Sequence, residues 1–256
     1  MKHLASLAAL LMLASPVMAA PELDSARAML AAGDYPQARQ TAIATETVEG
    51  DLLAAETMAA EIMLMTTPDA KDTAKDALKL VGRVLDRDPG NTEALFLRAL
   101  HQGFRTRSSS KLSIVMGGMI GDTKDDIEDF AAAAPGDPRA DALRGAWHLG
   151  IVRAAGDGKF GASLAEGLAA YDRAVASLPS DMAVLSNYAF SLIVMDDPEV
   201  LPRARALLDR IAALPATDAF SRETQARMNR LRAVIDQPEA LRDASRGLLN
   251  TEEVGG

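Results

Sequence analysis

The same plan governs two short stretches of the chain, Asp88-Pro89-Gly90-Asn91-Thr92-Glu93-Ala94-Leu95 and Leu178-Pro179-Ser180-Asp181-Met182-Ala183-Val184-Leu185. In each, an amphipathic helix ends, a proline prevents its continuation, and small polar residues turn the chain into a new helix. Each new helix places a leucine four residues before an alanine, which puts the two on one helical face. Units of this kind predict an array of short helices.

The rest of the chain has the same helical character. Apolar residues recur at steps of three and four almost everywhere, and no convincing alternation of strand length occurs. Proline, glycine, aspartate, asparagine and serine divide the apolar stripes into about twelve helices, which pair into roughly six antiparallel hairpins. The turn prolines at positions 89, 138, 179 and 215 are 49, 41 and 36 residues apart, so the repeat is degenerate. We predict an all-α solenoid.

The N-terminus has the features of an export signal. Lys2 precedes an apolar run from Leu4 to Ala14, and Val17-Met18-Ala19 forms a small-residue cleavage pattern. The run is too short for a membrane span, which needs roughly 20 apolar residues. We therefore expect a signal peptide over residues 1–19, a single domain over 20–249 and a disordered tail over 250–256. If the organism is Gram-negative, the mature protein is periplasmic.

Composition excludes several kinds of partner and chemistry. The chain has no cysteine, which removes disulfides, thiolate metal sites and the acylated cysteine of a lipoprotein. Its formal charge is −9, and losing residues 1–19 removes one lysine and no acid, which gives −10. Nucleic acid and anionic lipid require lysine and arginine to replace counterions, so we expect neither as a partner. No later segment reaches membrane-spanning length.

Several residues follow the tetratricopeptide repeat pattern. With Pro179 as the closing proline of a repeat, Tyr171 and Ala174 occupy the aromatic and small positions of a second helix. Leu149-Gly150 supplies a Leu-Gly pair, and Gly33-Asp34-Tyr35 supplies an interhelical turn. The chain thus resembles the tetratricopeptide repeat family, whose period is about 34 residues. Gly167 replaces the usual first alanine of a second helix, and residues 101–137 fit no repeat, so we treat that interval as an atypical insertion.

This resemblance implies a concave face lined by the first helix of each hairpin. Such a face would be apolar and aromatic with a few polar groups, as suits a peptide or a small apolar ligand. Trp147, the only tryptophan, either belongs to this face or anchors the core. The residues expected to bind a partner are Phe96, Leu100, Arg144, Trp147, His148, Ile151, Asn187 and Phe190.

The sequence shows no constellation of catalytic or metal-binding residues. Outside the export signal the only histidines are His101 and His148, 47 residues apart and without metal-ligand spacing. Nucleophile-elbow, phosphate-loop and dinucleotide motifs are missing, so we expect no cofactor, no metal and no enzymatic activity. The Gly- and Met-rich segment 112–121 is either an insertion folded over the core or a lid that contacts a partner.

Two functions remain. The first is a non-enzymatic periplasmic scaffold that holds an envelope protein or a peptide in its concave groove. The second is a small-ligand-binding accessory, because residues Phe160–Ser163 and Tyr171–Pro179 are similar to T-components of tripartite periplasmic transporters. Oligomeric state stays open, since the exposed end of a repeat array can stack on another copy.

Overall fold

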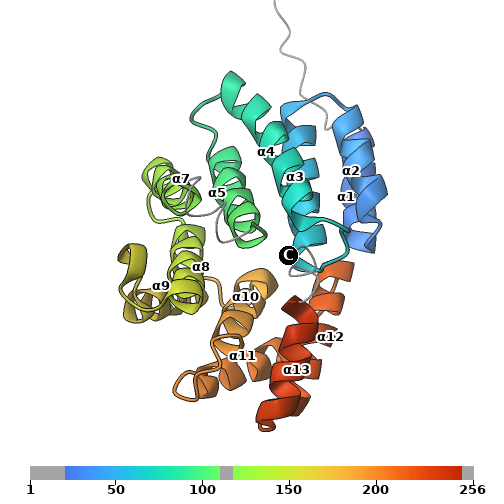
Figure 1. Ribbon diagram of the computed structural model, residues 1–256. Helices are drawn as coiled ribbons and strands as arrows, with labels where there is room; N and C mark the ends of the chain where they lie inside the picture. Colours follow the sequence, from blue (N-terminus) through green and yellow to red (C-terminus); the bar gives the residue numbers. More distant parts are fainter. Residues whose placement is uncertain (1–20, 110–117, 250–256) are drawn as a thin grey trace, which may run out of the picture.

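The computed structural model describes residues 21–109 and 118–249, which contain twelve α-helices and no strand (Figure 1). The expected export signal and the expected C-terminal tail lie outside these residues. The helices are α1 (Pro21–Ala32), α2 (Tyr35–Ala44), α3 (Val48–Met63), α4 (Ala70–Arg87), α5 (Thr92–Arg107), α7 (Met119–Ala133), α8 (Pro138–Ala155), α9 (Leu164–Ser177), α10 (Met182–Ile193), α11 (Leu201–Ala213), α12 (Ala219–Val234) and α13 (Pro238–Leu249).

The helices pack in adjacent pairs, which confirms the predicted all-α, solenoid-like array of six hairpins. Polar side chains at the predicted turns start many of them. The Ala94 N–H donates to the Asn91 side chain at 3.0 Å, and the Val184 N–H donates to Asp181 at 2.9 Å. Each cap satisfies a backbone donor that the first helical turn leaves without a partner. The two stretches with the same sequence pattern, 88–95 and 178–185, therefore both start a helix with a side-chain N-cap.

The interval 101–137 completes the third helical hairpin, which α5 and α7 form. Residues 101–107 are the last turns of α5, and α7 packs against α5 as the second helix of the third pair. Phe130 of α7 is fully buried, and its ring centroid lies 5.5 Å from that of Phe96. The interval that matches no repeat pattern therefore has the same role as the other second helices. Residues 110–117, which hold most of the Gly- and Met-rich segment, lie outside the described part.

The array closes on itself. Each first helix contacts the first helix of the next pair, from α1 through α3, α5, α8 and α10 to α12, and α12 also contacts α1. Figure 1 shows α3, α5, α8 and α10 around a common centre, with α7 and α9 farther out. At the closure Gly33 has φ +92°, and a Cβ added there would lie 2.8 Å from the Ala219 methyl carbon. Small side chains therefore let the first and last pairs meet.

Small residues also set the spacing between α8 and α9, the pair that carries the candidate site. A Cβ at Gly145 would lie 2.5 Å from the Tyr171 ring, and one at Gly167 would lie 2.8 Å from Leu149. Carbon atoms normally approach to about 3.5–4.0 Å, so only glycine permits this separation. The departure from the tetratricopeptide pattern at Gly167 thus has a steric reason. Within the described residues no helix is both long and apolar enough to cross a membrane.

Candidate partner-binding site

Four of the predicted binding residues meet in one apolar cluster between α5, α7 and α8. These are Phe96, Leu100, Trp147 and Ile151. Trp147 is only 8% exposed, and its Nε1–H donates to the Ile120 carbonyl at 3.1 Å. Of the two roles that the sequence leaves open for this tryptophan, the structure shows the core anchor: it fastens α8 to α7.

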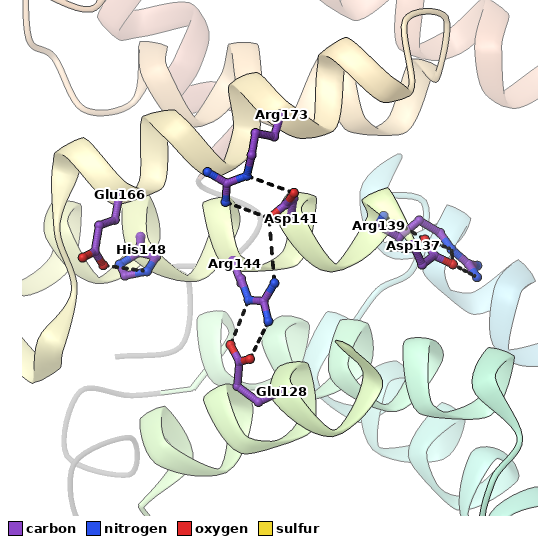
Figure 2. A network of polar contacts seen from close by, with 8 residues as sticks. All are labelled: Glu128, Asp137, Arg139, Asp141, Arg144, His148, Glu166 and Arg173. Atoms are coloured by element: carbon purple, nitrogen blue, oxygen red, sulfur yellow. Dashed lines mark hydrogen bonds and ion pairs between the residues drawn. The ribbon is translucent and has the colours of Figure 1, made fainter. Parts of the chain in front are cut away.

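Arg144 joins three helices through ion pairs (Figure 2). Its Nε lies 2.9 Å from Oε1 of Glu128 on α7, and it also pairs with Asp141 one turn earlier on α8. Asp141 in turn accepts from Arg173 of α9 at 2.8 Å. The hydrogen bond from Arg144 holds the pKa of Glu128 below its usual range. Through Glu128 and Asp141, the Arg144 guanidinium links α7, α8 and α9. Arg144 also borders a recess of about 180 Å³.

The two predicted residues on α10 lie apart from the cluster that contains Trp147. The Asn187 side-chain oxygen accepts from the Ser191 hydroxyl at 3.4 Å, one turn later on the same helix. Phe190 is half-buried against the core that α10 shares with α11 and α12. The eight predicted residues therefore do not form a single exposed surface.

His148 supports the loop between α8 and α9. The Ser163 N–H donates to its Nδ1 at 3.1 Å, so the proton of the neutral ring is on Nε2, which lies 3.4 Å from Glu166 (Figure 2). The ring meets Trp147 edge-on at 5.0 Å between centroids. Burial lowers the pKa of His148, and the Glu166 carboxylate opposes that shift. The buried Trp147 ring thus packs against His148, and His148 accepts a hydrogen bond from Ser163 at the end of the loop.

The loop, residues 156–163, is held in a single shape by backbone contacts. The Gly158 N–H donates to the Ala162 carbonyl at 2.9 Å, and the Leu164 N–H donates to the Asp157 carboxylate at 2.7 Å. Gly156, Gly158 and Gly161 have positive φ, which glycine adopts without steric cost. The side chain of Ala162 is buried. These contacts make the loop an ordered projection from the α8 and α9 hairpin.

Phe160 is the exceptional residue of this loop. It lies in the short 3-10 helix η1 (Lys159–Gly161), and its φ of +53° is a left-handed conformation that a bulky side chain rarely adopts. Its side chain is 54% exposed, and among the described large apolar residues only Ile43, at 36%, is also classed as exposed. A strained aromatic residue presented to solvent persists only where the surrounding structure holds it, and such positions concentrate at binding sites.

Two basic residues lie close to Phe160 in the sequence of this acidic protein. Arg153 lies in the last turn of α8, and Lys159 directly precedes the phenylalanine. In the described part of the chain neither forms an ion pair, whereas the chain as a whole carries a formal charge of −9. An exposed aromatic side chain with a lysine next to it in the chain has the composition of an interface anchor and its polar rim.

Sequence reasoning did not select Phe160 for binding. Gly156-Asp157-Gly158 reads as a turn, and Phe160 enters only through the resemblance to T-components. The available signal was a single aromatic residue placed between glycines, where neither a helix nor a strand can bury it. Of the predicted residues, His148 and Trp147 are the ones that serve this site, and they do so from beneath the loop.

Elsewhere the described residues offer little for chemistry. No three histidine or acidic side chains in residues 21–109 and 118–249 group in a way that could hold a metal ion. His101 is fully buried, and its Nε2 pairs with the Ala55 carbonyl at 2.9 Å. In comparisons with known proteins, no family model and no curated protein matches this chain.

Proposed function

We propose that this protein is a non-enzymatic, tetratricopeptide-like scaffold of the periplasm that binds a protein or peptide partner. The observation that carries the proposal is the ordered loop that presents Phe160, 54% exposed, in a left-handed conformation. The proposed contact surface is therefore the loop between α8 and α9, and not the concave groove that the sequence predicted. The predicted residues Trp147 and His148 become its supports.

The energetics favour a protein partner for such a loop. Aromatic anchors in desolvated pockets dominate binding energy at protein interfaces, where their truncation typically costs about 2 kcal/mol or more. A loop that is already ordered loses little entropy when it binds. The backbone contacts of Gly158 and Asp157 provide that order before any partner arrives.

A small-ligand accessory receives less support from the geometry. The recess beside Arg144 has a volume of about 180 Å³, and a second recess beside Leu241 has about 190 Å³. Ligand pockets usually span about 300–1,000 Å³, and Arg144 already has two acidic partners. A protein surface is therefore the better match to the exposed Phe160.

Site-directed photo-cross-linking in living cells tests the proposal. Phe160 is replaced by p-benzoylphenylalanine, an aromatic residue of similar shape that bonds to whatever contacts it under ultraviolet light. Ile43 of α2, the other exposed large apolar residue, receives the same replacement as a matched control. We expect a discrete cross-linked species in the envelope fraction from position 160 and none from position 43.

Competition makes the result specific. Unlabelled wild-type protein should suppress the cross-linked species, and the Phe160→Ala variant should suppress it at least about tenfold less well. Equal yields from positions 160 and 43, or equal competition by the alanine variant, would refute a binding role for this loop. Circular dichroism of the variants confirms that their helical content is unchanged.

A further inference from the structure

The end of the loop between α8 and α9 is held by an acceptor that can take up a proton. The Ser163 N–H donates to His148 Nδ1 at 3.1 Å, and Ser163 is also the residue whose side chain caps α9. The His148 side chain is only 13% exposed. An imidazole nitrogen accepts a hydrogen bond only while it carries no proton. The hydrogen bond from the loop to α8 therefore requires a neutral His148.

A second proton on His148 has opposite effects at the two ring nitrogens. At Nδ1 the new N–H points at the Ser163 N–H, so two donors face each other and the hydrogen bond is lost. At Nε2 the ring lies 3.4 Å from the Glu166 carboxylate, which pairs more strongly with a charged ring (Figure 2). Protonation thus weakens the contact with the end of the loop and strengthens the contact with the first turn of α9.

We propose that protonation of His148 releases the C-terminal end of the loop 156–163 from α8 and thereby weakens partner binding through Phe160. The inference concerns the regulation of this surface, and it rests on the proposed function of the loop. The left-handed backbone of Phe160 persists only while the surrounding contacts hold it. Loss of the Ser163 hydrogen bond removes one of these contacts, so the ring is no longer presented in a single position.

The charged groups that face His148 set the direction of the switch. Burial is the largest influence and disfavours the charged ring, as does Lys124 of α7, whereas Glu166 of α9 and Glu128 of α7 favour it. The pKa of His148 therefore lies below the ordinary 6.5 while the loop is held. Release returns the ring to solvent and brings its pKa closer to 6.5. Because the released form binds the proton more readily, release is favoured as the pH falls below 6.5, by up to about tenfold per pH unit between the two pKa values.

Nuclear magnetic resonance of the isotope-labelled protein between about pH 8 and about pH 5 tests the hydrogen bond directly. At the upper end of this range the His148 ring should carry its proton on Nε2 and none on Nδ1. As the pH falls, protonation of Nδ1 and an upfield shift of the Ser163 amide proton should follow one curve, with a midpoint below 6.5. The signals of His148 are those that the His148→Gln variant lacks.

Two variants make the titration specific. His148→Gln supplies an amide oxygen that can accept from the Ser163 N–H at every pH, so its Ser163 amide should not titrate. Asp157→Asn removes the carboxylate that accepts from Leu164 but keeps an acceptor there, and its Ser163 amide should titrate as in the wild type. A Ser163 amide that does not move when Nδ1 gains its proton, or that titrates equally in His148→Gln, would overturn the inference.

Photo-cross-linking from position 160 in envelope extract measures the effect on binding. From about pH 8 to about pH 5 the yield should fall at least about threefold with His148 present and stay within about twofold in His148→Gln. A yield that falls equally in both would overturn the control of binding by His148. If position 160 gives no cross-link at any pH while the Ser163 amide titrates, the proposed function fails and the release of the loop stands. If the cross-link forms equally across the range and the Ser163 amide does not titrate, the inference fails and the proposed function stands.

Discussion

Gly145 offers the sharpest test of how α8 and α9 are packed. A Cβ at this position would lie 2.5 Å from Cδ2 and 2.6 Å from Cγ of Tyr171. Tyr171 cannot yield easily, because it is 1% exposed and its ring stacks on that of Tyr188 with centroids 4.4 Å apart. We therefore predict that Gly145→Ala destabilises the protein even though alanine is the better helix former.

The magnitude follows from two opposing terms. Alanine in place of glycine inside a helix stabilises it by about 1 kcal/mol. Overpacking a well-filled core costs about 1–3 kcal/mol, and a contact at 2.5 Å belongs at the upper part of that range. The net expectation is a loss of about 1–2 kcal/mol in the free energy of unfolding.

Gly150 provides the matched control on the same helix. It is exposed, and a Cβ added there would meet no heavy atom within 4 Å, so Gly150→Ala should gain about 1 kcal/mol. Urea unfolding, followed by circular dichroism and by the fluorescence of Trp147, measures both variants. If Gly145→Ala proves as stable as Gly150→Ala, the close approach of α8 and α9 at Tyr171 is refuted.

Three further predictions concern buried or strained residues. Burial lowers the pKa of His101 to about 4, so between that value and the ordinary 6.5 only the unfolded chain binds the proton. The free energy of unfolding should therefore fall as the pH drops through this window, by up to about 3 kcal/mol, and His101→Gln should flatten this part of the profile in urea titrations at several pH values. Trp147→Phe removes the indole donor to the Ile120 carbonyl and leaves part of a buried side-chain site unfilled, and should cost about 1–3 kcal/mol, measured as a shift of the urea midpoint by circular dichroism. Phe160→Gly relieves the left-handed backbone and should raise the free energy of unfolding by about 1 kcal/mol. Phe160→Ala keeps a side chain at this φ and should leave the free energy of unfolding nearly unchanged. A loss of stability in either variant would show that the ring packs against the protein rather than being exposed to solvent.

The helical hairpins could be predicted because their ends are encoded locally. Asn91 and Asp181 cap the helices that follow them, and each cap depends on residues only three positions apart. The direction in which a helical face points depends instead on which other helices are present. The packing partners of a helix are distant in sequence, so the sequence pattern predicted only in part which helical faces are exposed.

The face of α8 illustrates this limit. Arg144, Trp147 and Ile151 share one stripe of α8, but α7 covers it through Glu128 and the Ile120 carbonyl. Because residues 101–137 match no repeat pattern, the repeat gave no packing partner for this stripe, and the stripe looked free. The exposure of Phe160 is similarly non-local, since it depends on a loop that His148 and Asp157 hold from both sides.

Closure of the array changes how such a protein can associate. An open solenoid can add copies by stacking its end helices, because those helices leave one face without a neighbour. Here the contact between α1 and α12 covers part of both ends, at the close approach of Gly33 to Ala219. Stacking at that face is therefore obstructed.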